Sequence, residues 1–138
     1  MKFFKDIFAS LKNPSLHQPL QQDEREAIID LLLLGIYYDD HLSLGESEEF
    51  RSVVNSIGWE SELEVSGYIN NAILRVRSIR SSDETCSDFI RQIAKRLTSA
   101  GSRERALKLL NRLFRTDGKT NIEKAFFQQV EAAFNASA

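Results

Sequence analysis

Residues 23–38 read DEREAIIDLLLLGIYY, and this stretch decides the fold class. Asp23 and Glu26 have the spacing of a helix capping box. The apolar residues that follow would surround a helix on nearly all sides, and such a helix has to be covered by its neighbours. We therefore expect a helix from Asp23 to about Tyr38 at the centre of a bundle.

The rest of the chain favours helices as well. Its 138 residues are the size of one domain, and its only prolines are Pro14 and Pro19. Leu, Ala, Glu, Arg, Lys and Gln are common, which favours α-helix. We predict an all-α fold, a single compact bundle of about seven helices. Residues 1–19 are expected to form an amphipathic helix and a linker, and residues 20–138 the helical domain.

Capping signals and apolar spacing place the other helices. Ser61 with Glu64 and Ser81 with Glu84 mark two helix starts. Gly101 is expected to end the helix that begins at residue 81, and Ser102 to cap the next one. The further expected helices cover residues 3–11, 44–57, 102 to about 115, and 121–134.

Two segments of the chain resemble each other after a shift of 77 residues. The shift places the core residue Leu32 on Leu109. It also places Asp40 on Asp117 and Glu46 on Glu123. Two helices match at their core residues through helical periodicity alone. That periodicity does not require an Asp and a Glu six residues apart in both loops. We therefore expect two pseudo-repeated helical hairpins, with the helices between residues 60 and 100 inserted.

The two loops of these hairpins are acidic. They read YDDHLSLGESEEF from Tyr38 and RTDGKTNIEKAFF from Arg115. Carboxylate oxygens are the ligands that Ca²⁺ and Mg²⁺ prefer, although the spacing does not match an EF-hand. A divalent cation (Ca²⁺, Mg²⁺ or Zn²⁺) bound by both loops together would use the candidate ligands Asp39, Asp40, Glu46, Asp117 and Glu123.

Helix capping explains the same residues without a metal. Ser43 with Glu46, and Thr120 with Glu123, have the spacing of capping boxes. Asp40 and Asp117 have the character of turn residues that follow a helix. On the residue chemistry alone capping is the simpler explanation, and both interpretations stay open.

At these residues the sequence resembles the TerB-like family, named for a tellurite-resistance protein. The segment RLFRTDGKTNIEKAFF is similar to the family's repeated helix–loop–helix motif, and GIYYDDHLSLGESEEF matches it more loosely. His41 stands where that motif usually has Gly, and Thr116 where it has a small Ala. The resemblance implies an all-helical, non-enzymatic module with an acidic, cation-binding surface and a role in stress responses such as tellurite resistance. By this resemblance, the acidic residues of the family's motif correspond to Asp40, Glu46, Asp117 and Glu123.

Catalytic and membrane-spanning patterns are missing from the sequence. Cys86 is the single cysteine, and no Gly-rich phosphate loop, Ser/His/Asp arrangement or H-E-x-x-H pattern occurs. We expect no enzyme. The longest apolar run is too short for a bilayer, and no secretory signal is recognisable, so a cytoplasmic location is expected.

The N-terminal segment offers two kinds of contact. Residues 2–12 carry Phe3, Phe4 and Phe8 among lysines, which suits peripheral contact with the inner face of a membrane. The alternative, which we favour, is that this segment packs on the bundle or in a homodimer, because so short a helix needs packing to form.

Charge is distributed unevenly along the chain. The net charge of −2 combines a balance of −10 over residues 23–64 with one of +7 over residues 75–119. A basic stripe of Arg105, Lys108, Arg112 and Arg115 is expected on a helix face opposite the leucines. This stripe suits docking of an acidic protein partner. Nucleic acid is the weaker alternative, because the pI is about 5.7 and no aromatic residues interleave with the stripe.

Overall fold

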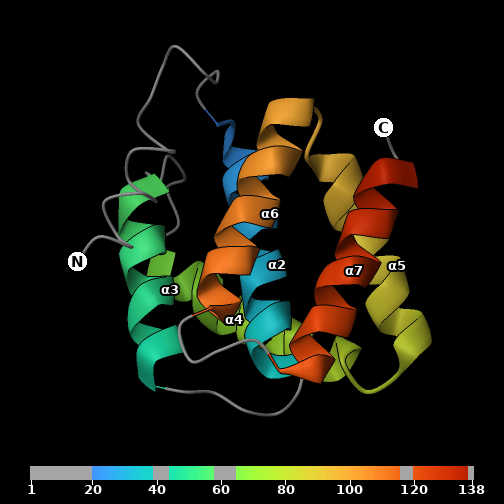
Figure 1. Cartoon of the computed structure of the whole chain (residues 1–138). Coiled ribbons are helices and arrows are strands. Elements are labelled where there is room, and N and C mark those ends of the chain that lie inside the picture. Colours follow the sequence, from blue (N-terminus) through green and yellow to red (C-terminus); the bar gives the residue numbers. More distant parts are fainter. Residues whose placement is uncertain (1–19, 39–43, 58–64, 116–119, 137–138) are drawn as a thin grey trace.

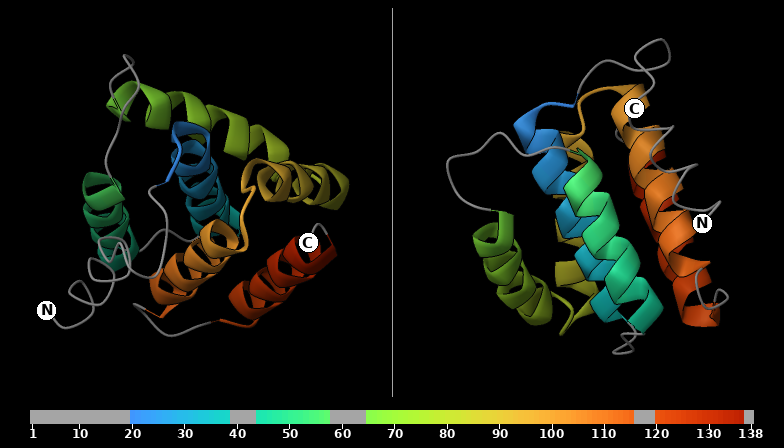
Figure 2. Two further views of the ribbon diagram at one scale, coloured as in Figure 1. Left: turned by 90° about the horizontal axis from the view of Figure 1, so that it is seen from above. Right: turned by 90° about the vertical axis from the view of Figure 1, so that its left-hand side faces the viewer.

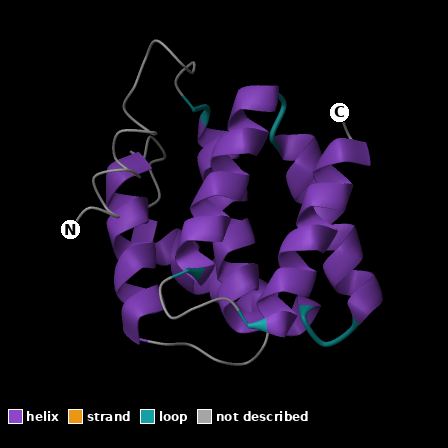
Figure 3. Ribbon diagram, viewed as in Figure 1, coloured by secondary structure: helices purple, strands orange, loops and turns teal. Residues whose placement is uncertain are grey.

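A computed structural model of the chain describes residues 20–38, 44–57, 65–115 and 120–136, and within 44–57 the side chains of 48–54. Every regular element in these ranges is an α-helix, and together the helices form one bundle (Figures 1 and 3). They are α2 (Gln22–Tyr38), α3 (Leu44–Ile57), α4 (Val65–Ile79), α5 (Asp83–Arg96), α6 (Ala100–Phe114) and α7 (Asn121–Ala136). The all-α bundle is confirmed for these residues. The helix expected at 3–11, the linker to residue 19 and the Ser61–Glu64 start lie outside them.

Helix α2 is the centre of the bundle, as the sequence predicts. It packs against each of the other five described helices, which surround it when the bundle is seen from above (Figure 2, left). Every residue from Ala27 to Ile36 is buried. Burial on all sides explains why the apolar residues of this helix do not keep to one face.

A glycine allows a close approach between α2 and α6. A Cβ atom placed on Gly35 would lie 2.9 Å from Cδ1 of Leu110 and 3.0 Å from Cζ of Phe114. Both neighbours are fully buried, so neither has free space into which to move. The packing of α6 against the central helix therefore depends on the absence of a side chain at residue 35.

The connection between α5 and α6 differs from the sequence prediction. Helix α5 begins after Ser82, whose side chain accepts a hydrogen bond from the backbone N–H of Thr85, and it ends at Arg96. Ser99 caps α6 in a reciprocal capping box with Ser102. The prediction that Gly101 ends one helix and that Ser102 caps the next was therefore wrong. The chain turns earlier, at the fully buried Leu97, whose backbone is not helical.

Helices α2 and α6 terminate at the same end of the bundle, and α3 and α7 begin there (Figure 1). None of the described helices combines the length and the apolar composition that a membrane crossing requires.

Candidate functional site

The structure describes the side chain of one of the five predicted metal ligands. Asp39, Asp40 and Asp117 lie outside the described residues. Glu46 is the third residue of α3, and only its backbone is described. Glu123 lies in the first turn of α7 and is 6% exposed. Within the described ranges, no three His, Cys, Asp or Glu side chains come together in a way that would hold a metal ion.

Glu123 takes part in the predicted capping box. Its Oε1 accepts a hydrogen bond from the backbone N–H of Thr120 at 3.0 Å. In return, Oγ1 of Thr120 accepts one from the backbone N–H of Glu123 at 3.1 Å. These two bonds satisfy donors that the start of a helix otherwise leaves without a partner. A negative charge here also lies favourably at the positive end of the helix dipole.

An aromatic cluster joins the helix ends from which the acidic loops leave. The rings of Tyr38, the last residue of α2, and Phe126 in α7 have centroids 4.7 Å apart. Phe126 also meets Phe114, the last residue of α6, edge to face at 6.0 Å. Burial raises the pKa of Tyr38, and the charge of Asp83 adds to the effect. One cluster therefore fixes the ends of α2 and α6 against the start of α7.

The predicted basic stripe on α6 is shorter at the surface than expected. Arg105 is only 4% exposed, so its place on an outer face was predicted wrongly. It lies four residues before Leu109, and this spacing puts it on the buried side of the helix. Lys108 is exposed and pairs with Glu104 at 3.2 Å. Arg115 is exposed and Arg112 half-buried, so both remain on the accessible side.

Arg105 faces the beginning of α2 instead. Burial lowers the pKa of its guanidinium, and attraction to the Glu24 carboxylate opposes that effect. Glu24 is itself 6% exposed, and its Oε1 accepts a hydrogen bond from the backbone N–H of Gln21 at 3.0 Å. Arg105 and Glu24, one from the basic and one from the acidic half of the sequence, are thus both buried here and attract each other.

A second buried carboxylate organises the contact of α2 with α4 and α5. Asp30 is 2% exposed. Its Oδ1 accepts from the Tyr68 hydroxyl at 2.8 Å and from Nη2 of Arg75 at 3.4 Å. Its Oδ2 accepts from Nη1 of Arg96 at 2.7 Å. The sequence shows only an Asp within an apolar run, because its three partners lie 38 to 66 residues further along the chain.

Burial and these hydrogen bonds shift the proton affinities in this network. Burial first, and then the charge and hydrogen bond of Asp30, raise the pKa of Tyr68 to about 12. Burial alone would lower the pKa of Arg96, but the hydrogen bond and charge of Asp30 outweigh it and leave the pKa raised. The Arg75 guanidinium also lies over the Tyr68 ring, 5.4 Å from its centroid. The network is thus held with Tyr68 neutral and Arg96 charged.

Cys86 is a buried core residue. It is 1% exposed, and its thiol donates to the backbone carbonyl of Ile79 at 3.5 Å. Burial, together with the charge of Asp83, raises the pKa of this thiol. A reactive cysteine needs the opposite conditions, a lowered pKa and access to solvent.

No family model matches this chain, and neither a curated protein nor a solved structure matches it. The side chains described above therefore carry the functional inference by themselves.

Proposed function

We propose that this chain is a non-enzymatic, TerB-like module that binds a divalent cation through its two acidic loops. The bound state would be passed to a protein partner in a cytoplasmic stress response of the tellurite-resistance type. The observation that carries the proposal is the aromatic cluster of Tyr38, Phe126 and Phe114. Asp39 directly follows Tyr38 in the sequence, and Glu123 precedes Phe126 by one helical turn.

The arrangement of the helices supports a duplicated hairpin. The shift of 77 residues lays α2 on α6 and α3 on α7. An internal two-fold relationship requires that the contact of α2 with α7 have a counterpart between α6 and α3, and both contacts are present. Leu32 and Leu109 are buried in their two helices, as are Val53 and Val130. A duplication of this kind places the two acidic loops as equivalents of each other.

The capping of Glu123 is compatible with its role as a cation ligand. Only Oε1 of this carboxylate is engaged with Thr120. Within the described part of the chain, no donor bonds to its second oxygen. A carboxylate held in one orientation by a helix cap is a better ligand than a freely rotating one, because it loses less entropy when it binds.

A pure protein-interaction bundle is the second candidate, and the two hydrogen bonds between Thr120 and Glu123 favour it. In that case the acidic loops would serve only as helix caps. The accessible basic residues Lys108, Arg112 and Arg115 would form the docking face for an acidic partner in either case. Binding of this kind depends on charge and should weaken as the salt concentration rises.

Two substitutions separate the candidates. Glu123→Gln keeps an acceptor at a position where capping boxes accept Gln, but it removes the ligand charge. Thr120→Ala removes the hydroxyl that accepts from the N–H of Glu123, and it keeps the carboxylate. If the loops bind a cation, Mg²⁺, Ca²⁺ or Zn²⁺ should raise the melting temperature of the wild type and of Thr120→Ala, and much less that of Glu123→Gln. If each cation changed the melting temperatures of all three proteins equally, or changed none of them, cation binding by Glu123 would be contradicted. Helix capping would then be the remaining role of the loops.

A further inference from the structure

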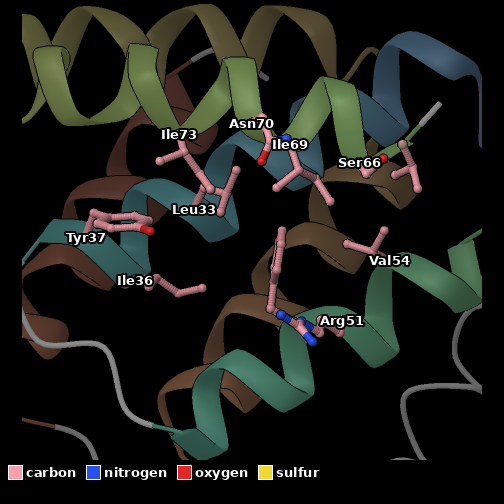
Figure 4. Close-up of a pocket in the computed structure, with 11 residues that line it drawn as sticks. Leu33, Ile36, Tyr37, Arg51, Val54, Ser66, Ile69, Asn70 and Ile73 are labelled. Carbon is pink, nitrogen blue, oxygen red and sulfur yellow. The ribbon is translucent and has the colours of Figure 1, made fainter. Parts of the chain in front are cut away.

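An apolar groove opens between α3 and α4, with α2 as its floor (Figure 4). Its volume is about 490 Å³, within the range of small-molecule sites. Leu33 and Ile36 line it from α2, and Ile69 and Ile73 from α4. Figure 4 shows Leu33, Ile69 and Ile73 in the space between the helices. None of the described residues that line the groove belongs to the predicted acidic site.

The described part of the rim of the groove carries positive charge only. Arg51 on α3 is the single charged residue among the described residues that line it, and Ser66 and Asn70 on α4 supply uncharged polar groups. Arg51 is exposed, and no ion pair joins it to another described residue. A cation beside an apolar groove favours a ligand with an apolar body and an anionic end.

The dimensions favour a single alkyl chain over a docked helix. The lining of α4 runs from Val65 to Ile73, about 12 Å at the rise of an α-helix. An extended chain of about ten carbons covers that length, given C–C bonds of about 1.52 Å and angles of about 111°. The described lining of α2, from Leu33 to Tyr37, covers about one turn, roughly 6 Å, and so does that of α3, whose side chains are described from residue 48 to residue 54. A helix of average length, about 11 residues or 16 Å, would extend past the lining that α2 provides.

We infer that this groove binds a medium-chain carboxylate, with its alkyl chain on the apolar floor and its carboxylate at the Arg51 guanidinium. The alkyl chain of the ligand excludes water from the apolar side chains of α2 and α4. This burial of apolar surface provides the larger part of the affinity. The pairing with Arg51 orients the ligand and selects an anionic end over a neutral or cationic one. Binding in this groove requires no cation at the acidic loops.

The test is a calorimetric titration of the full chain with dodecanoate below its micelle-forming concentration. We expect one saturable site per chain. Arg51→Gln should weaken dodecanoate binding roughly tenfold, the effect of losing one charged hydrogen bond. Dodecanol, which lacks the charge, should bind the wild type and Arg51→Gln equally. The control Arg91→Gln, an exposed arginine of α5 that pairs with Asp88, should bind dodecanoate as the wild type does.

A second set of variants tests the location. Ser66 is exposed at the rim, so Ser66→Trp fills the groove without replacing a core residue, and it should abolish binding. Asn70→Trp, one turn further along α4, serves the same purpose if Ser66→Trp does not fold. Absence of a saturable site, or unchanged affinity in Arg51→Gln or in a folded groove-filling variant, would overturn the inference. A dimer of the chain that Ser66→Trp dissociates would assign the groove to a second copy instead.

Discussion

The ring of Tyr38, at the end of the central helix, packs against the ring of Phe126 in the last helix at 4.7 Å. This contact joins two parts of the chain that are nearly ninety residues apart and that each border an acidic loop. Phe126 is 1% exposed, so this contact involves the hydrophobic core. This contact therefore fixes the end of α2 against α7.

The cap of α7 should contribute measurably to stability. We expect Thr120→Ala to lower the free energy of unfolding by about 1 kcal/mol, because the backbone N–H of Glu123 loses its acceptor. Glu123→Gln should cost less than half as much, since its amide oxygen can still accept from the N–H of Thr120. Urea unfolding followed by circular dichroism measures both. An equal loss in the two variants would contradict this expectation, because it would show that the charge of Glu123 stabilises the helix start as much as the hydrogen bond from its N–H to Thr120 does.

The buried carboxylate of α2 should be the most sensitive polar residue of the core. Asp30→Asn keeps the shape of the side chain but removes the charge that holds Arg96 and Arg75. Both arginines are partly exposed and can turn to water, so we expect a loss of roughly 2–3 kcal/mol, below that of a fully buried pair. The matched control is Asp88→Asn, which breaks an exposed pair with Arg91 and should cost under about 1 kcal/mol. Similar losses for the two variants in urea unfolding would contradict the role of Asp30.

Tyr68 should make stability depend on pH in the alkaline range. Its folded pKa of about 12 lies above the unfolded value of 10.0, so folding favours the neutral phenol. The contribution is complete below pH 10 and is lost as the pH rises toward 12. We expect the unfolding free energy to fall over this window in the wild type and to fall less in Tyr68→Phe. Absorbance of tyrosinate, compared between the two proteins, locates the titration. If the difference in absorbance between the two proteins gave Tyr68 a pKa near 10.0, the prediction would be wrong.

Gly35 should resist even the smallest side chain. We expect Gly35→Ala to lower stability by about 1–3 kcal/mol, because the new methyl group would press on Leu110 and Phe114. The helix propensity of Ala works in the opposite direction by up to about 1 kcal/mol. Asn71→Ala, at an exposed position within α4, isolates that propensity effect and should be slightly stabilising. Thermal unfolding of both variants decides the matter, and a stabilised Gly35→Ala would show that α6 can move away.

Periodicity and capping signals predicted the bundle, the central place of α2 and the start of α7, since each depends on residues close in sequence. The end of α5 could not be predicted in this way. Gly101 has the usual character of a helix stop, but the Ser99–Ser102 capping box holds it inside α6. Helix α5 ends before Leu97, which is fully buried, and only the packed bundle determines that burial.

The buried charges were the least predictable part of the candidate site. Arg105 shares the regular spacing of Lys108, Arg112 and Arg115, so a basic stripe includes it. Its spacing to Leu109 predicts the buried side of the helix instead. In the structure Arg105 is buried and interacts with the charge of Glu24. Asp30 has partners on α4 and α5 that no local pattern indicates, because the contact exists only after three helices have packed.

The measurement that tests cation binding most directly is a titration of the isotope-labelled full chain with Mg²⁺, Ca²⁺ and Zn²⁺ in turn, followed by amide NMR. The account predicts that at least one cation shifts the amides of residues 39–46 and 117–123 together, with a single saturation curve. The amide of Phe126 should shift with them, whereas the exposed stretch around Asp88 on α5 should stay unchanged. Spectra that do not move at millimolar concentrations of all three cations would contradict the proposed function, as would two loops that saturate independently.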